Sequence, residues 1–389
     1  MPHFDIAVVG GGPAGAWTAF LLASRGARVA ILDPSHPREK PCGGGVSARA
    51  LDLLRPLGSL RSLPGVVIAS GRFSDGRADV DVDLPPASTT TPALLVASRR
   101  DFDLTLLEAA RAAGAELVAE RVTAIEPRER GWTIRTSKGT VDCDRLVGAD
   151  GANSLVRRSV TRPFPRRALS VASGYFVRGL SGTQIEILFT QSPAGYLWSF
   201  PRPDHLAVGV GAQADEATSA RLFDISAAWI ERQVGAPRHA LTRYSWPIPS
   251  LSEIDLQRET SAGERWLLVG DAAGLVDPIT REGIYYALAS AQLAASSLME
   301  DQSSRRYVSG LRDGIYKELR KAARMKDHFF RSAFTGLLIK ALQRSPGIRH
   351  LMAGLVSGTQ SYEGLRRRLL MTGEVRLAAE YLFGLHSGG

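Results

Sequence analysis

The sequence has few cysteines, few aromatic residues and no long apolar run. Its two cysteines, Cys42 and Cys143, are far apart and show no metal-ligand spacing, which argues against a disulfide framework and against a zinc site. No apolar run reaches about 18 residues, and the chain does not open with a basic segment followed by an apolar one. We therefore expect a cytoplasmic protein without a transmembrane helix or signal peptide.

The excess of positive charge lies in one part of the chain. From residue 301 onward, 16 Lys and Arg stand against 7 Asp and Glu, which accounts for the whole net charge of +9. Such a segment suits an anionic membrane surface, where the protein would be peripheral, or a small acidic electron carrier; a solvated helical face explains it equally well. The aromatic residues are not interleaved with the basic ones, so we expect no nucleic-acid binding.

A glycine-rich turn near the N-terminus has the pattern of a dinucleotide-binding unit. An apolar run over 5–9 leads to glycines spaced G-x-G-x-x-G, a helical stretch follows over 17–25, and a second apolar run ends at Asp33. The glycines permit a tight turn and let a pyrophosphate approach the start of the helix, while Asp33 is placed to accept a hydrogen bond from a ribose hydroxyl. The predicted cofactor-binding residues of this loop are Gly10, Gly12, Pro13, Ala14 and Gly15.

A second glycine-rich stretch follows at Pro41–Gly45. Consecutive glycines allow the backbone to lie flat against a planar ligand, so Gly43 and Gly44 are predicted to bind the cofactor, with Cys42 beside it. Cys42 is then a candidate redox or proton-donating thiol. An incidental cysteine in a flexible loop is the alternative.

The segment from Arg99 to Ala110 has the apolar spacing of an amphipathic helix. Arg100, at its basic entrance, is a candidate phosphate ligand, and a surface arginine pair is nearly as good an explanation. Further on, a strand, a tight turn and a helix start share the stretch Gly148–Arg157. Its Asp150 is placed for ribose or ribityl hydroxyls, with Ser154 and Arg157 for polar closure around them.

A third constellation begins with an apolar strand that ends at Gly270 and Asp271. This strand would deliver the Asp271 carboxylate to a ribityl-like chain of hydroxyls. A turn then leads through Gly283 and Ile284 into an alanine-rich helix, whose amides and positive dipole end would face a developing anion. Arg281 would strengthen this effect if its side chain points inward.

Between Pro165 and Ser250 the composition changes to short strands separated by turns. Side chains alternate along a strand, so Tyr196, Trp198 and Phe200 share one face. Packing in the core and lining of an apolar substrate cavity explain these aromatic residues equally well. Beyond Ser297 the chain is predicted to be helical, with one apolar stripe over residues 308–322.

These patterns predict an α/β fold: a Rossmann-type FAD-binding domain, a second and mostly antiparallel β substrate domain, and C-terminal helices. The first domain is expected to be discontinuous, because strand-rich segments interrupt it twice. The boundaries are 1–64, 94–164 and 255–300 for the FAD-binding domain, 65–93 and 165–254 for the substrate domain, and 301–389 for the helical segment.

The chain resembles the FAD-dependent geranylgeranyl reductase family, within the larger hydroxylase-like flavoprotein group. The similarity covers roughly residues 4 to 300. In many relatives of the wider group a glycine stands where this chain has Arg281. Five stretches carry the resemblance: Gly10–Gly15, Pro41–Gly45, Asp150–Arg157, Gly270–Asp271 with the helix after it, and Pro193–Pro201, which is the most family-specific.

The resemblance implies an FAD enzyme that saturates isolated double bonds of a polyprenyl chain. Hydride would come from flavin N5, Cys42 would donate or relay the proton, and Tyr196, Trp198 and Phe200 would line a long apolar tunnel. NADPH or a reduced electron carrier would supply the electrons.

Two other functions remain open on the same cofactor domain, because a fold does not determine a reaction. One is a flavin monooxygenase or halogenase that acts on an aromatic substrate through a flavin hydroperoxide. The other is an electron-transfer flavoprotein, which needs no enclosed substrate tunnel. The cysteine-glycine stretch and the aromatic strand favour the reductase.

Overall fold

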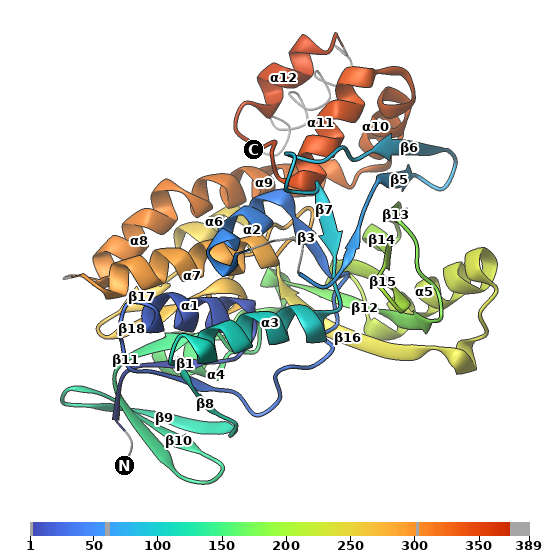
Figure 1. Ribbon diagram of the computed structural model, residues 1–389. Coiled ribbons are helices and arrows are strands. Elements are labelled where there is room, and N and C mark those ends of the chain that lie inside the picture. Colours follow the sequence, from blue (N-terminus) through green and yellow to red (C-terminus); the bar gives the residue numbers. More distant parts are fainter. Residues whose placement is uncertain (1–2, 59–62, 301–302, 374–389) are drawn as a thin grey trace.

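The computed structural model describes residues 3–58, 63–300 and 303–373. Two large sheets lie at an angle to each other, one group of helices covers the first sheet, and the C-terminal helices cover the second (Figure 1). The predicted fold class is confirmed: a Rossmann-type parallel sheet, a mostly antiparallel second sheet and a helical C-terminal part. The exact domain boundaries stay a prediction.

The first sheet is built around the N-terminal βαβ unit. Strand β1 (His3–Val9) pairs in parallel with β2 (Val29–Leu32) and with β11 (Thr140–Gly148), and helix α1 (Pro13–Ala23) makes the crossover. All four residues of β2 are buried, as expected of a strand covered on both faces. The remaining strands of this sheet are β8 (Glu116–Val118), β9 (Val122–Arg128), β10 (Gly131–Thr136), β17 (Ala262–Gly263) and β18 (Trp266–Leu268).

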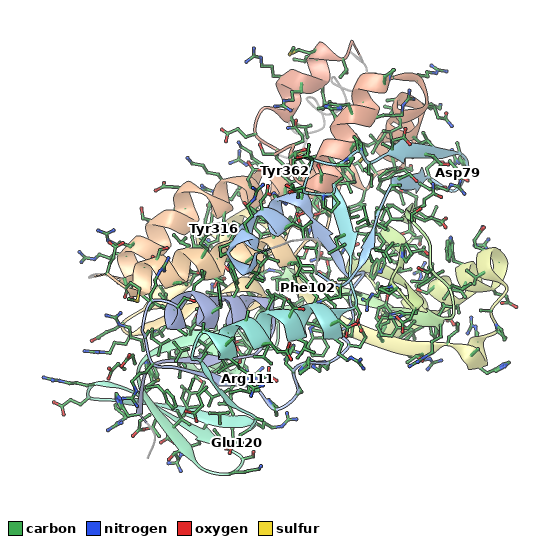
Figure 2. The ribbon with its side chains drawn as sticks, in the orientation of Figure 1. Asp79, Phe102, Arg111, Glu120, Tyr316 and Tyr362 are labelled. Carbon is green, nitrogen blue, oxygen red and sulfur yellow. The ribbon has the colours of Figure 1, made fainter. Side chains whose placement is uncertain are left out.

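Helices α1, α3 (Arg99–Ala112) and α7 (Ile284–Leu298) pack together against the first sheet. In α3 the predicted amphipathic pattern is confirmed. Phe102 is fully buried, whereas Arg111 near the end of the same helix is exposed (Figure 2). The shorter helices of this region are α2 (Ala48–Leu53), α4 (Leu155–Val160) and α6 (Glu253–Gln257), with 3-10 turns at Arg55–Leu57, Arg166–Ala168 and Gly270–Ala273.

The second sheet has a parallel pair in an otherwise antiparallel arrangement. Strand β5 (Ser70–Ser74) runs parallel to β13 (Gln184–Gln191), so a segment from the first third of the chain completes a sheet formed mainly later. Helix α5 (Ser219–Val234) covers the outer face and ends at Gly235, which is left-handed at φ 72°. The other strands are β6 (Asp79–Asp83), β12 (Leu169–Arg178), β14 (Ala194–Pro201), β15 (His205–Gln213) and β16 (Thr242–Pro249).

The C-terminal helices cover the inner face of this second sheet. The apolar stripe expected over residues 308–322 belongs to two helices, because Gly314 separates α8 (Ser303–Asp313) from α9 (Ile315–Phe329). None of the helices in the described part of the chain has the length and apolar composition needed to cross a bilayer. The remaining elements are α10 (Ser332–Arg344), α11 (Pro346–Ser357), α12 (Leu365–Met371), a 3-10 turn at Arg238–Ala240, and a small sheet of β3 (Gly45–Ser47), β7 (Leu94–Val96) and β4 (Val66–Val67).

The close packing of α1 on β1 gives a first testable prediction. A Cβ at Gly15 would lie 1.9 Å from the carbonyl oxygen of Gly10, which is backbone and has no room to move. We expect Gly15→Ala to lower the free energy of unfolding by about 2–5 kcal/mol although alanine favours helices, because overpacking outweighs propensity. Chemical denaturation followed by circular dichroism measures this change. Gly139→Ala, where a Cβ meets nothing within 4 Å, is the control; equal stability of the two variants would refute the prediction.

Candidate functional site

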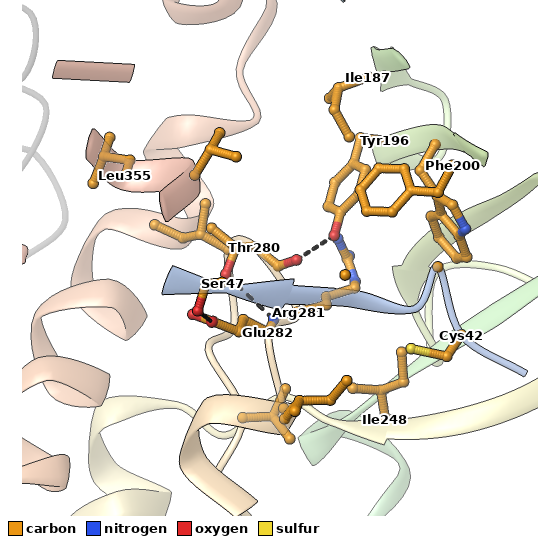
Figure 3. A pocket seen from close by; sticks show the side chains of 18 of the residues that line it. Cys42, Ser47, Ile187, Tyr196, Phe200, Ile248, Thr280, Arg281, Glu282 and Leu355 are labelled. Carbon is orange, nitrogen blue, oxygen red and sulfur yellow. Dashed lines mark hydrogen bonds between the residues drawn. The ribbon is translucent and has the colours of Figure 1, made fainter. Parts of the chain in front are cut away.

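A continuous cavity of about 340 Å³ joins the N-terminal glycine loop to the inner face of the second sheet. Its lining includes Gly12–Ala14, the loop Lys40–Gly45 and residues of the C-terminal helices. Figure 3 shows the part of the cavity between Cys42, Tyr196 and Leu355. The cavity therefore brings together the glycine loop, the cysteine loop, Asp271 and the aromatic strand, which lie far apart in the sequence. The sequence had not indicated that α10, α11 and α12 would form its far wall.

The three spaced glycines have different structural roles. Gly10 has φ 107°, and a Cβ there would lie 2.4 Å from the carbonyl oxygen of Ala149, so the loop can pass the neighbouring strand only as glycine. Gly12 is different, because its hypothetical Cβ meets only the His36 ring at 3.6 Å. The open side of Gly12, Pro13 and Ala14 faces the cavity at the start of α1, where unpaired amides favour an anion such as a pyrophosphate.

Asp33 lies at the end of β2, but its carboxylate already has several donors. Oδ2 accepts hydrogen bonds from the Gly11 amide and the His36 ring, both at 2.8 Å, and Oδ1 accepts from the amides of Ser35 and His36. Burial alone would raise the pKa of Asp33, yet His36 and these amides lower it well below its usual range. A ribose hydroxyl would have to share an acceptor that the protein already uses, so the role of Asp33 in cofactor binding stays a prediction.

His36 bridges two buried carboxylates. Its second ring nitrogen, Nε2, lies 3.5 Å from Asp103. Burial tends to lower the pKa of His36, but the hydrogen bonds and charges of Asp103 and Asp33 outweigh burial and raise it. The raised pKa favours the protonated form of His36, and the sequence analysis missed this residue. A histidine three residues after the acidic end of a strand was the only local sign of it.

The arginine that faces the cavity is Arg99 and not Arg100. Arg99 is 4% exposed, binds Asp103 through two hydrogen bonds of 2.8 and 2.9 Å, and interacts with the Cys42 thiol. The Arg100 side chain is 67% exposed and reaches only Asp101. Successive residues on a helix point about 100° apart, so only one of the pair can face inward. A phosphate contact of Arg100 stays a prediction, and the structure places its side chain outside the cavity lining.

The cysteine loop lies in close contact with residues on either side of it. Gly44 has φ 87°, and a Cβ there would lie 2.3 Å from the carbonyl oxygen of Ala97. On the other side, the Phe200 ring would lie 2.8 Å from a Cβ at Gly43. The Gly44 amide donates a 3.3 Å hydrogen bond to Cys42 Sγ, which fixes the thiol at the cavity wall. The other cysteine, Cys143, is buried in β11, where burial raises its pKa to about 12.

Arg202, which the sequence analysis did not single out, secures this loop. Its side chain is fully buried, donates hydrogen bonds to the carbonyl oxygens of Cys42 and Gly43, and forms an ion pair with Glu39. Glu39 in turn accepts a 2.7 Å hydrogen bond from the Ser98 hydroxyl and one of 3.1 Å from an amide at the start of α3. Arg202 therefore joins the end of the aromatic strand to the cysteine loop.

Asp150 acts as a helix cap in this structure. Its carboxylate accepts hydrogen bonds from the Ser154 hydroxyl and from the amides of Leu155 at 2.6 Å and Val156 at 3.1 Å. Burial raises the pKa of Asp150. The neighbouring residues Ala149 and Gly151 line the cavity. The expected contact of the Asp150 carboxylate with ribose or ribityl hydroxyls stays a prediction, and a hydroxyl there would have to share an acceptor that the protein already uses.

The expected polar closure by Ser154 and Arg157 is directed to the protein itself. Ser154 caps α4 by accepting a 2.8 Å hydrogen bond from the Arg157 amide. The Arg157 guanidinium forms a two-point ion pair with Glu259, at 2.7 and 3.0 Å, and lies over the Phe164 ring. Both side chains have partners within the protein and stabilise the turn through these contacts.

Asp271 is the free carboxylate of the site. It lies in the turn Gly270–Ala273 and lines the cavity, and no described residue donates a hydrogen bond to its side chain. Gly270, left-handed at φ 55°, anchors the turn because its amide donates to Ser290. Across from it Gly283 and Ile284 begin α7, whose first amides have no side-chain cap. We propose Asp271 as the acceptor for ribityl hydroxyls and the start of α7 as the partner of an anionic edge of the cofactor.

The aromatic face of β14 both packs and lines the cavity. Tyr196, Trp198 and Phe200 all border the cavity, and Tyr196 also stacks with Phe330 at 6.4 Å between ring centroids. The Tyr196 hydroxyl donates to the carbonyl oxygen of Thr280 (Figure 3). All three residues therefore pack in the second core and also border the cavity. Their role in substrate binding stays a proposal.

These features fit FAD. The start of α1 offers amides for a pyrophosphate, Asp271 offers an acceptor without a donor among the described residues, the glycines of the cysteine loop present no side chains, and α7 presents uncapped amides. All of them border one cavity.

Comparison with known proteins agrees with this fit. Residues 3–321 match a family model described as an FAD binding domain. A menaquinone reductase of Mycobacterium tuberculosis is 32% identical, with 79% of this chain and 80% of that protein covered. A geranylgeranyl diphosphate reductase of Rhodobacter capsulatus is 31% identical, with 76% of this chain and 75% of that protein covered.

Two solved structures share the fold. A geranylgeranyl bacteriochlorophyll reductase-like protein from Thermoplasma acidophilum superposes with a TM-score of 0.76 at 20% identity, covering 96% of this chain and 100% of that one. A flavin-dependent brominase gives a TM-score of 0.71, also at 20% identity, with 92% and 94% covered.

The buried His36 predicts a pH-dependent contribution to stability. Its pKa is raised above the unfolded value of about 6.5, so its stabilisation is complete below that pH and is lost as the pH rises through the raised value. We expect the unfolding free energy of wild type to exceed that of His36→Gln by the largest amount near pH 6 and by less above neutral pH. Each tenfold gain in the affinity of folded His36 for its proton corresponds to about 1.4 kcal/mol of this difference. Denaturant titrations from pH 6 to 9 measure it. The exposed His239→Gln is the control; a pH-independent difference at His36 would contradict the assignment.

The contrast between Asp271 and Asp150 gives another prediction. Asp271→Ala should weaken FAD binding by about 10- to 100-fold with little change in stability, because it removes a charged acceptor that has no protein donor. Asp150→Ala should instead lower stability by about 1–2 kcal/mol through loss of the helix cap. Cofactor titration of the apoprotein and thermal unfolding separate the two effects. Full flavin retention by purified Asp271→Ala would rule out the proposed role.

Proposed function

The chain belongs to the geranylgeranyl reductase family of FAD-dependent oxidoreductases, and on that premise we propose that it reduces carbon-carbon double bonds of a prenylated substrate. The observation that carries the proposal is the single cavity, which joins the FAD-fitting groove to an apolar chamber with the Cys42 thiol between them. The names of the relatives support this substrate class, since two of them are called menaquinone reductase and geranylgeranyl diphosphate reductase.

The chamber suits a long apolar chain. Aromatic residues of β14 form one wall, and apolar side chains of the C-terminal helices form the other. Burial of prenyl methyl and methylene groups there is favourable at about 0.8 kcal/mol for each CH₂. The same apolar walls would keep water away from the double bond. Reduction of an unactivated alkene requires this exclusion, because protonation of the alkene competes with protonation of solvent. The C-terminal wall includes Phe329, Phe334, Leu338, Ile348, Leu351, Met352, Leu355 and Leu369.

When bound, FAD supplies the hydride for one alkene carbon. The second carbon needs a proton, and we propose that Cys42 Sγ donates it. The thiolate left behind would be stabilised by the adjacent Arg99 guanidinium and by the Gly44 amide. Arg202 is a positioning residue in this proposal, since it holds the carbonyl oxygens of Cys42 and Gly43 without touching the thiol. The product then contains two more hydrogens than the substrate.

The electron donor is proposed to be NADPH, bound transiently at the same groove, or a small acidic carrier on the basic C-terminal helices. Exposed Arg306 and Arg324 belong to those helices, but each already pairs with a nearby glutamate. The same basic surface would serve peripheral contact with a membrane that contains prenylated lipids.

An anaerobic single-turnover experiment tests the function and the role of Cys42. Photoreduced wild type, mixed with geranylgeranyl diphosphate or a prenylated quinone, should reoxidise and yield a product heavier by two hydrogens. Cys42→Ser should keep FAD but slow this step by about 100-fold, the usual worth of a positioned proton donor. Flavin absorbance and product mass are the readouts.

Cys143→Ala is the matched control and should react at the wild-type rate. No product with any prenyl substrate, together with hydroxylated aromatic products when oxygen is admitted, would replace the reductase with a monooxygenase. An unchanged rate in Cys42→Ser would return Cys42 to a structural role.

A further inference from the structure

Arg281 places a cationic group inside the apolar chamber. Its side chain borders the cavity beside Tyr196, with the guanidinium 4.9 Å from the centre of the Tyr196 ring and 5.6 Å from that of Phe330 (Figure 3). The Nε and Nη1 atoms are buried and have no hydrogen-bond partner among the described residues. Ring faces and the neighbouring Tyr196 hydroxyl are poor substitutes for a negatively charged acceptor.

The fold makes specific room for this side chain. Arg281 has φ 57°, a left-handed conformation that a non-glycine residue rarely adopts. On the facing strand, a Cβ at Gly211, near the end of β15, would lie 2.9 Å from Arg281 Nε, so glycine at this position leaves space for the arginine side chain without a shift. The left-handed backbone of Arg281 and the absence of a side chain at Gly211 together accommodate Arg281 in the chamber.

Among the described residues no carboxylate forms an ion pair with the Arg281 guanidinium, and its Nε and Nη1 atoms have no hydrogen-bond partner. The pKa of the neighbouring Lys326 is lowered chiefly by burial and further by the Arg281 charge, although Asp327, Glu216 and Asp215 act in the opposite direction. An unpaired cation in an apolar environment is unfavourable unless a ligand supplies the acceptor. Other buried arginines around the cavity have carboxylate partners: Arg49 pairs with Glu282, and Arg99 with Asp103.

We propose that Arg281 binds an oxygen atom of the substrate's polar head group. The inference rests on the proposed function and narrows it. The substrate is a molecule with a prenyl tail and an oxygen-bearing head, either a quinone carbonyl or a diphosphate, and the head enters the chamber beside Tyr196. The tail then lies along α10 and α11, against Phe334, Leu338 and Leu351. The double bond presented for reduction is one close to the head.

Ligand binding to the oxidised holoenzyme tests this without any turnover. Changes in flavin absorbance would report binding of three probes: geranylgeranyl diphosphate, a short-tailed prenylated naphthoquinone, and a linear isoprenoid hydrocarbon without a head. Arg281→Met should weaken binding of an oxygen-bearing probe by about 10- to 100-fold and leave the hydrocarbon unchanged or bound more tightly. The probe that loses affinity identifies the head group as anionic or carbonyl.

Two further variants serve as controls for misfolding and for the loss of any arginine. Arg281→Gly suits the left-handed backbone and should fold at least as well as wild type while showing the same loss of affinity. Arg130→Met, at an exposed turn between β9 and β10, is the matched arginine control.

Equal binding of all probes by wild type and Arg281→Met would overturn the proposal. So would unchanged substrate binding with an altered FAD affinity or flavin midpoint potential, which would assign Arg281 to the cofactor. Failure of wild type to reduce any probe would count against the proposed reaction only, since the binding comparison does not depend on it.

Discussion

The site depends on the narrow space in which the loop Cys42–Gly45 is held. The carbonyl oxygen of Ala97 limits it on one side and the Phe200 ring on the other, and neither leaves room for a side chain at Gly44 or Gly43. Arg202, fully buried, then fixes the carbonyl oxygens of the loop. Phe200 lies in β14 of the second sheet and Arg202 directly follows that strand, whereas Ala97 lies between β7 and α3. The loop therefore joins the two parts of the molecule that border the cofactor groove and the substrate chamber.

Four buried or half-buried charged side chains near the cofactor groove are held in place by one another. Arg99, Asp103, His36 and Asp33 form a continuous chain of ion pairs that runs from the Cys42 thiol to the amide of Gly11 in the glycine loop. Buried charges remain in a protein when they are paired and hydrogen-bonded, and this chain satisfies that condition. It also connects the glycine loop and the cysteine loop, which would hold different parts of the cofactor in the proposed arrangement.

The parts of the site that the sequence predicted are those set by local backbone geometry. The spacing of Gly10, Gly12 and Gly15 required a turn, a helix start and close packing, and the structure has all three. Side-chain partners were harder to foresee. Arg99 and Arg100 are chemically equal in the sequence, and only the direction in which α3 docks decides which is buried. Asp150 was predicted to contact hydroxyls of the cofactor, and the structure adds two amides of α4 as donors to its carboxylate, which the sequence did not indicate.

By itself the sequence determined the βαβ unit, the FAD-binding class, the antiparallel second sheet and the shared face of Tyr196, Trp198 and Phe200, because glycine spacing and side-chain alternation are local properties. Only the tertiary structure decided that the C-terminal helices close the chamber, that Arg202 anchors the cysteine loop, and that Arg281 points into the chamber unpaired. Each of these contacts joins residues of separate elements, and such meetings depend on how sheets and helices pack, which no short stretch of sequence encodes.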